Sequence, residues 1–302
     1  MTQFSRRDVL MATGAAALAR TAGAKEGSRM ITRKIPRSGE ALPAVGMGTW
    51  QTFDVGPSAE ARAPLLEVLR RFFDGGGRLI DSSPMYGRSE TVVGDLLAEG
   101  GFVGKPFLAT KVWTRGKQAG IDQMDESMRR MRTKRLDLLQ VHNLVDVDTQ
   151  LETLRAWKEE GRVRYVGVTH YQLGAFDDIE RLVKSQPLDF IQIPYSVGVR
   201  EAEKRILPLA QERGVAAIVM RPFEGGTLFR DARAKQLPPF AAELGATSWA
   251  QLFLKFILAH PAVTCAIPAT SKPAHMSDNL LAMRGALPDE RQKRKLLEVL
   301  GA

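Results

Sequence analysis

Apolar and polar positions along the chain follow two alternating patterns from Arg33 onward. Short apolar runs, typical of buried strands, are separated by longer segments in which apolar residues recur at the spacing of one helix face. The short runs predict eight strands, at residues 44–48, 78–81, 107–111, 136–142, 164–169, 190–193, 215–220 and 263–267.

The longer segments predict helices between these strands, and glycines mark several of their ends. Gly75-Gly76-Gly77, Gly161 and Gly214 follow predicted helices, as expected where a backbone leaves a helix with positive φ. Ahead of the first strand, residues 30–35 and 41–45 flank a polar turn and predict a β-hairpin. The predicted helices occupy residues 59–74, 118–132, 149–160, 173–184, 203–213 and 248–259.

Repeated strand and helix units fit either a closed barrel or an open doubly wound sheet, and periodicity alone does not separate the two. The glycine fingerprint of an open dinucleotide-binding sheet is missing, because Gly46-Met47-Gly48 continues into Thr49-Trp50-Gln51. Residues 75–77 lack the Lys-Ser/Thr of a phosphate loop. We therefore predict a single α/β domain over residues 25–302, a (β/α)8 TIM barrel whose N-terminal β-hairpin caps the bottom.

Composition agrees with one globular domain and excludes several other classes. The chain has 302 residues, of which 44% are hydrophobic and 25% charged, enough to bury a large core. The net charge of +9 comes partly from clusters at residues 129–135 and 291–295, which lie in helical patterns without interleaved aromatic residues. We interpret these as solvated helix faces and expect no nucleic-acid partner. The lone Cys265 allows no internal disulfide or cysteine-rich metal site, and no metal is expected.

The first residues differ from the rest of the chain. The paired arginines of Ser5-Arg6-Arg7-Asp8-Val9-Leu10 precede an alanine-rich apolar run, residues 9–19, and Ala22-Gly23-Ala24 offers a cleavage site. This order resembles a twin-arginine export signal; the alternative is a disordered or amphipathic tail. We expect residues 1–24 to direct the folded protein through the twin-arginine machinery to the periplasm. The run is too short for a stable membrane anchor.

Three predicted strands end on residues that can carry chemistry. Asp81, Lys111 and His142 close the second, third and fourth strands, and Tyr86 follows Asp81 by a short loop. In a barrel, the carboxyl ends of the strands converge on one mouth, where active sites form. Each residue alone has an ordinary explanation, such as a helix cap or an exposed lysine. It is their joint position at the same mouth of the predicted barrel that indicates a site.

This combination suits proton transfer to a carbonyl. A free tyrosine titrates near ~10, and a neighbouring ammonium such as Lys111 would lower that pKa by stabilising the phenolate. Asp81 would keep Lys111 charged, and His142 would orient the substrate oxygen toward Tyr86. A cofactor must supply the hydride, because no side chain can.

The segments around these residues resemble a known family. Residues 81–87, 109–113 and 138–143 are similar to the three catalytic segments of the aldo-keto reductase superfamily. The similarity continues through residues 48–50 and 161–168, Gln192 and residues 267–270, and it spans the chain from about Ile31 to the C-terminus. The resemblance implies reduction of an aldehyde or ketone by NADP(H), with Tyr86 as the general acid.

The resemblance also implies binding residues. Trp50, Met85 and Trp113 would line the pocket for a small carbonyl substrate, and Thr169, His170 and Gln192 would hold the nicotinamide carboxamide. Residues 269–279 resemble the segment that binds the adenosine phosphate. The full set implied for the cofactor is Gly48, Thr49, Trp50, Thr169, His170, Gln192, Met220, Arg221, Pro222, Phe223, Ile267, Ala269, Thr270, Ser271, Lys272, His275, Asp278 and Asn279.

The sequence departs from the family at three points. His170 stands where the family usually has asparagine, and Met220 where an aromatic ring commonly stacks on the nicotinamide. Lys272 and His275 occupy the 2′-phosphate region, which has no arginine. Two other functions stay open: a sugar oxidoreductase or epimerase of the same fold, and a regulatory barrel that only holds the cofactor. The intact Asp, Tyr, Lys and His set argues against the second.

Overall fold

The described part of the chain forms a sheet of parallel strands. The structure is a computed structural model, and it describes residues 30–301; the predicted export signal lies outside them. Eight strands pair in chain order, each parallel to the next. They are β3 (Met47–Gly48), β4 (Leu79–Asp81), β5 (Phe107–Val112), β6 (Leu136–His142), β7 (Val163–Thr169), β8 (Phe190–Pro194), β9 (Ala216–Met220) and β10 (Val263–Ala266).

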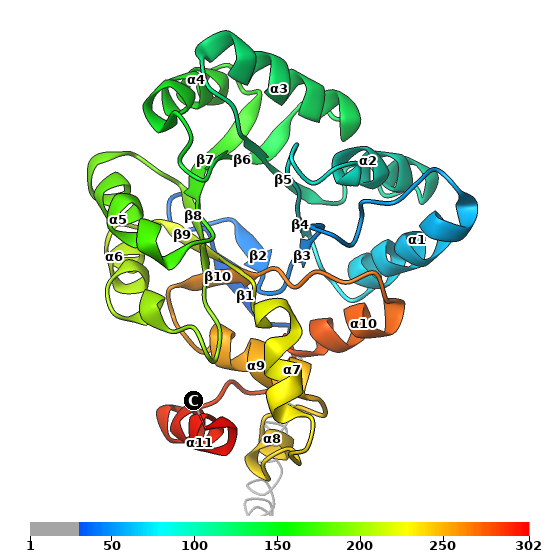
Figure 1. Cartoon of the computed structure of the whole chain (residues 1–302), viewed down its shortest axis with the longest axis vertical. Helices are drawn as coiled ribbons and strands as arrows, with labels where there is room; N and C mark the ends of the chain where they lie inside the picture. The colour runs from blue at the N-terminus through cyan, green and yellow to red at the C-terminus, as the bar shows by residue number, and fades with distance from the viewer. Residues whose placement is uncertain (1–29, 302) are drawn as a thin grey trace, which may run out of the picture.

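The first and last strands of this sheet meet and close it. Single parallel bridges join Val45 to Ala266 and Gly48 to Ala269. The backbone N–H of Gly46 donates to the carbonyl of Ala266 at 2.8 Å. Figure 1 shows the strands forming a ring inside a circle of helices. The predicted (β/α)8 barrel is confirmed, and the open sheet is excluded.

The predicted hairpin is also present. Strands β1 (Thr32–Lys34) and β2 (Ala41–Pro43) pair antiparallel, and Gly39 takes a φ of 74° in the turn between them. The Arg37 side chain donates to the carbonyl of Leu188, just before β8, at 2.9 Å. The hairpin therefore covers the amino ends of the strands and leaves the opposite mouth open.

Helices surround the barrel, and several of them were not predicted. The predicted helix at 59–74 has the observed bounds, whereas the one at 173–184 begins as a 3₁₀ turn before its α-helix. Helices α2, α7, α8 and α10 were missed, whereas α11 contains residues 291–295, for which a helical pattern was predicted without bounds; α8 and α11 lie at the bottom of Figure 1. The α-helices are α1 (Ala59–Asp74), α2 (Ser89–Glu99), α3 (Lys117–Arg130), α4 (Val147–Glu159), α5 (Phe176–Ser185), α6 (Ile206–Glu212), α7 (Thr227–Ala232), α8 (Phe240–Glu243), α9 (Trp249–Leu258), α10 (Pro273–Leu281) and α11 (Glu290–Leu300).

Strand side chains alternate between two apolar layers, and this alternation positions the site. On β6, Leu139 and Val141 pack in the layer between strands and helices, whereas Leu138 packs inside the barrel. Gln140 and His142 follow Leu138 at the strand's two-residue period and continue its face toward the mouth. The inner face of one strand thus changes from apolar to functional as it approaches the open end.

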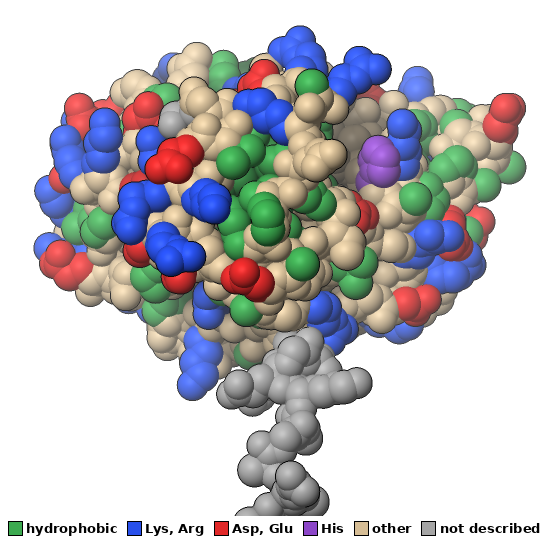
Figure 2. All heavy atoms as spheres, turned by 90° about the horizontal axis from the view of Figure 1, so that it is seen from below, with side chains coloured by type: hydrophobic (Ala, Val, Ile, Leu, Met, Phe, Trp, Pro, Cys, Tyr) green, Lys and Arg blue, Asp and Glu red, His purple; other side chains and the backbone are tan. Residues whose placement is uncertain are grey.

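Three basic residues of the 129–135 cluster form ion pairs with surface carboxylates. Arg129 and Arg130 both contact Glu126, and Arg132 contacts Asp95. On the face seen in Figure 2, basic and acidic side chains are also interspersed. Within residues 30–301, no helix combines the length and hydropathy needed to cross a bilayer.

Candidate active site

A buried ion pair lies at the carboxyl ends of β4 and β5. The ammonium of Lys111 donates to Asp81 Oδ2 and to the backbone carbonyl of Ser82, both at 2.7 Å. Lys111 is 1% exposed and Asp81 2%. Because charged groups are stable in such surroundings only when paired and hydrogen bonded, these contacts fix the ammonium in place.

Tyr86 reaches this pair from the loop that joins β4 to α2. Its backbone N–H donates to the carbonyl of Ser83 at 3.0 Å, which closes a tight turn. The next residue, Gly87, has a φ of 58°, and a Cβ there would lie 2.3 Å from Asp54 Oδ2. The turn therefore needs glycine, and it places the Tyr86 ring centre 4.9 Å from the ammonium of Lys111.

The fourth predicted residue completes the group. The rings of Tyr86 and His142 lie 6.0 Å apart, centre to centre, in an edge-to-face arrangement. The structure thus brings Asp81, Tyr86, Lys111 and His142 together, although they come from three strands and a loop. The prediction that strand ends would converge here is confirmed by the fold.

The pKa values of this group follow from burial and charge. Burial raises the pKa of Tyr86; Lys111 acts in the opposite direction, and the net pKa is above its usual value. We expected Lys111 to lower the pKa of the phenol, so the net direction in the chain without cofactor or substrate is the reverse of that expectation. Burial opposes the charge of Lys111, but Asp81 and Tyr86 together hold the pKa of Lys111 above its ordinary value.

His142 is a neutral imidazole. Burial, followed by the charge of Lys111 and the nearby His170, lowers the pKa of His142 to about 3. Its Nδ1 lies 3.1 Å from the hydroxyl oxygen of Ser83, a residue that is fully buried. Sequence reasoning gave no role to Ser83.

Two glutamines join Asp81 to the neighbouring strands. The Gln192 amide nitrogen donates to Asp81 Oδ2 at 3.2 Å, and Gln140 donates to Gln192 Oε1 at 3.0 Å. Gln192 was predicted to hold the nicotinamide, whereas Gln140 was missed. The sequence signal for Gln140 is its position two residues before His142, on the same face of β6.

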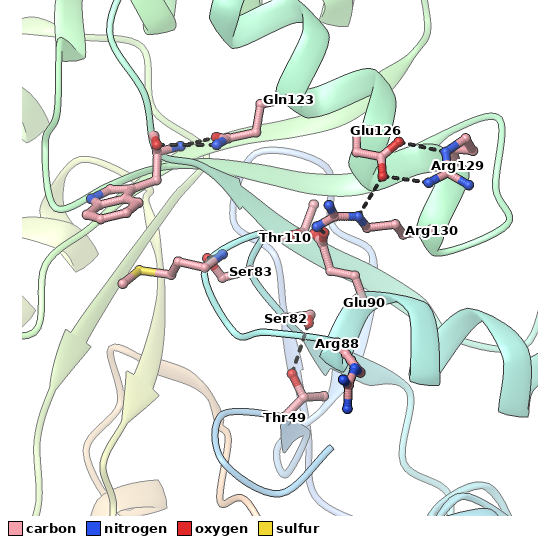
Figure 3. Close-up of polar contacts among 12 residues, drawn as sticks. Thr49, Ser82, Ser83, Arg88, Glu90, Thr110, Gln123, Glu126, Arg129 and Arg130 are labelled. Atoms are coloured by element: carbon pink, nitrogen blue, oxygen red, sulfur yellow. Dashed lines mark hydrogen bonds and ion pairs between the residues drawn. The ribbon is translucent and has the colours of Figure 1, made fainter. Parts of the chain in front are cut away.

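A buried carboxylate on α2 supports the strand that carries Lys111. Glu90 is 1% exposed, and the hydroxyl of Thr110 donates to its Oε1 at 2.6 Å. Arg130 lies 3.6 Å from the other oxygen of Glu90 and also contacts Glu126 (Figure 3). Burial raises the pKa of Glu90. Sequence reasoning missed this residue, because its burial depends on packing between α2 and α3.

The three residues predicted for substrate binding line the rim of the mouth. Trp50, Met85 and Trp113 follow β3, β4 and β5, and their exposed fractions are 52%, 42% and 42%. The side-chain amide of Gln123, on α3, makes hydrogen bonds with both the backbone N–H and the backbone carbonyl of Trp113. It accepts from the N–H at 2.6 Å and donates to the carbonyl at 3.3 Å (Figure 3).

The residues predicted for the nicotinamide end lie around the same mouth. Thr169, at the end of β7, is fully buried, and its hydroxyl has no hydrogen-bond partner among the described residues. His170 is half-buried and stacks on Tyr171, with ring centres 5.6 Å apart. Gly48 and Thr49 are buried, and the Thr49 hydroxyl donates to the carbonyl of Asp81 at 3.0 Å.

The loop after β9 borders a cavity that does not include the four residues Asp81, Tyr86, Lys111 and His142. Met220, Pro222 and Phe223 are wholly or partly buried, whereas Arg221 is exposed. A cavity of about 290 Å³ lies here, and its lining includes Arg221, Glu224 and Tyr171.

The predicted adenosine segment follows β10. Ile267 and Thr270 are buried, Ala269, Ser271, Lys272 and His275 are exposed, and Asn279 is 3% exposed. The Asp278 carboxylate accepts from Ser248 at 2.7 Å and from Gln251 at 2.6 Å. Asp278 thus holds the start of α9 to α10. The described residues contain no cluster of acidic, histidine or cysteine side chains able to hold a metal ion.

Known proteins resemble this chain in fold and in sequence. The model of the Aldo/keto reductase family matches residues 44–294, so the chain belongs to that family. Methylglyoxal reductase YeaE of Escherichia coli is 30% identical over 83% of this chain and 89% of its own. Aldo-keto reductase YhdN of Bacillus subtilis is 28% identical over 61% and 60%. An aldo/keto reductase from Klebsiella pneumoniae, solved with NADP and acetate, has a TM-score of 0.74 and 25% identity over 87% of this chain and 93% of its own.

Proposed function

We propose that this protein is an NADP(H)-dependent reductase that converts an aldehyde or ketone to an alcohol. The observation that carries the proposal is the Lys111–Asp81 pair, at 2.7 Å and almost fully buried, beside Tyr86 and His142. A binding protein has no need of a buried charge pair next to a phenol. The regulatory alternative explains this arrangement less well.

In the proposed reaction, His142 donates a hydrogen bond to the carbonyl oxygen and orients it toward Tyr86. A nicotinamide held near Thr169, His170 and Gln192 would supply the hydride for the carbonyl carbon. The Tyr86 hydroxyl gives its proton to the same oxygen, which completes the alcohol and leaves a phenolate. Lys111 stabilises that phenolate until solvent returns the proton, and Asp81 keeps Lys111 charged and in place.

The residues around the mouth fit a nicotinamide cofactor. A buried hydroxyl without a partner, such as that of Thr169, is costly unless a ligand uses it. An amide group there would satisfy it, with Gln192 and His170 beside it. Arg221, at the rim of the neighbouring cavity, suits the pyrophosphate. The NADP complex of the Klebsiella pneumoniae relative supports NADP(H) as the cofactor.

The substrate is a small carbonyl compound that enters over an apolar rim. Exposed tryptophans at positions 50 and 113 favour the apolar part of a substrate, while its oxygen reaches Tyr86. Methylglyoxal belongs among the test compounds, because the Escherichia coli relative is named for it.

Rapid mixing of the NADPH-loaded protein with a panel of carbonyl compounds tests the proposal. Wild type should oxidise NADPH, and Tyr86→Phe should lower turnover about 100- to 10,000-fold while nucleotide affinity stays within a few fold. Val103→Ala is the control, because Val103 is exposed and lies in the loop before the amino end of β5, whereas the tetrad lies at the carboxyl ends of the strands. No oxidation by wild type with any compound would favour the cofactor-holding alternative.

We also propose that the protein is exported in folded form to the periplasm. The support is the sequence alone: paired Arg6 and Arg7, an apolar run and a small-residue cleavage site. Replacing Arg6 and Arg7 by lysine keeps the charge and removes the pair, so processing and export should fail. If the double variant still reached the periplasm with its signal cleaved, the proposal would be refuted. Because twin-arginine export carries folded proteins, the cofactor would be acquired before export.

A further inference from the structure

A neutral histidine can orient a carbonyl oxygen in only one of its two forms. With the proton on Nε2, that nitrogen donates to the oxygen; with the proton on Nδ1, Nε2 is an acceptor and repels it. His142 is neutral in this chain, so the position of one proton decides whether the residue can act.

The partner of Nδ1 is the hydroxyl of Ser83, 3.1 Å away. Ser83 is fully buried, and its oxygen makes one other hydrogen bond among the described residues, a contact in which it accepts the N–H of Met85 at 3.4 Å. If Nδ1 carried the proton, the Ser83 oxygen would accept twice and its own proton would have no acceptor. A buried hydroxyl without an acceptor is costly, so donation from Ser83 to Nδ1 is favoured.

We propose that Ser83 is a positioning residue whose hydroxyl donates to Nδ1 of His142 and so keeps the ring proton on Nε2. Nε2 has no partner among residues 30–301 and is not sealed from solvent, which leaves it available to a substrate oxygen. The backbone supports this geometry, because the Ser83 carbonyl accepts from the Tyr86 N–H in the same turn. One serine thus links the acid and the orienting group. The catalytic consequence rests on the proposed reductase function.

The other charged or titratable groups near His142 do not set its tautomer. Lys111 and His170 lower its pKa and so favour the neutral ring, but no hydrogen bond joins either of them to the imidazole among the described contacts. Ser83 alone contacts a ring nitrogen of His142 within hydrogen-bond distance in that part of the chain.

NMR of the ring nitrogens measures the tautomer directly. Long-range proton–nitrogen spectra of the ¹⁵N-histidine-labelled protein, without nucleotide and at neutral pH, should show His142 with bare Nδ1 and protonated Nε2. Two internal references have this form: Nδ1 of His170 accepts from Gln172 N–H at 3.1 Å, and Nδ1 of His260 accepts from Ala262 N–H at 3.2 Å. His142→Gln assigns the signal. A proton on Nδ1 in wild type would overturn the proposal, even if no Ser83 variant folds.

Variants then test the cause. Ser83→Ala should give a mixture of the two forms, and Ser83→Thr, which retains a hydroxyl, should restore the Nε2–H form. Ser82→Ala is the matched control, because it is a neighbouring buried serine whose hydroxyl contacts Thr49 instead of His142. An unchanged tautomer in Ser83→Ala would refute the role of Ser83.

Activity gives an independent reading. Ser83→Ala should lower kcat by about 2- to 10-fold, the range expected when one hydrogen bond that biases an equilibrium is lost, with unchanged NADPH affinity. Normal kcat alongside a mixed tautomer would overturn the catalytic consequence. If wild type fails to oxidise NADPH while His142 carries the Nε2 proton, the proposed function is wrong and the tautomer assignment stands.

Discussion

Lys111 and Asp81 form an ion pair of 2.7 Å in which both side chains are at most 3% exposed. The pair bridges β4 and β5, so it is part of the barrel as well as of the site. Removing one partner from such a pair leaves a buried charge without compensation, which is more costly than removing both.

We therefore expect Lys111→Met to lower the free energy of unfolding by about 3–5 kcal/mol. The double variant Lys111→Met/Asp81→Asn should be more stable than the single variant, because the uncompensated carboxylate is gone. Urea unfolding of each protein measures the effect. Arg129→Met, which breaks an exposed pair with Glu126, is the control and should barely change the midpoint. Equal midpoints for wild type and Lys111→Met would contradict the expectation.

The pH dependence of the reaction follows from two pKa shifts. Tyr86 must be protonated to act as an acid, and burial raises its pKa, so reduction should decline only as the pH rises through a value above about 10. His142, with a pKa of about 3, stays neutral and adds no step near neutral pH. We expect kcat/KM to be flat between about pH 6 and 9. A step near pH 6.5 in initial rates would contradict this state of His142.

A glutamine that holds the backbone of Trp113 should affect substrate affinity. The Gln123 side chain binds both the backbone N–H and the backbone carbonyl of Trp113. Loss of this side chain removes both hydrogen bonds and lets the Trp113 segment at the rim of the mouth move. Gln123→Ala should raise KM for a bulky carbonyl about 3- to 10-fold and leave kcat within about twofold, because binding is lost and proton transfer is not. Gln118→Ala, on the same helix and bonded to Asp122, is the control. A fall in kcat with constant KM would refute the role.

The sequence predicted the barrel and its tetrad because both depend on local patterns. Strand ends are visible in the alternation of apolar residues, and parallel strands bring those ends together. The contact of Ser83 with His142 joins residues 59 positions apart, and no local pattern indicates it. Glu90 and Gln123 depend similarly on helix packing. The expected direction of the Tyr86 pKa shift was wrong for a similar reason. Burial of the phenol in the folded chain raises its pKa more than the charge of Lys111 lowers it, and the sequence does not show that burial.

We expect the choice between NADPH and NADH to depend on one exposed cation, Lys272. Lys272 is the residue just before α10, and its side chain makes no capping hydrogen bond; helix N–H groups and a positive side chain together favour a phosphate. Asp278, the acidic residue nearest in sequence, is bonded to Ser248 and Gln251 and so does not compete for Lys272. A 2′-phosphate gains from this arrangement, whereas a ribose hydroxyl does not.

Lys272→Ala should therefore weaken NADPH binding by about tenfold and leave NADH binding nearly unchanged, and higher salt should reduce the wild-type preference because the contact is exposed. Lys295→Ala, which removes an exposed lysine of α11, is the control for net charge. The measurement is fluorescence titration of both nucleotides at low and high salt. Equal losses of affinity for NADPH and NADH in Lys272→Ala would show that Lys272 acts on the fold of the segment and does not recognise the phosphate.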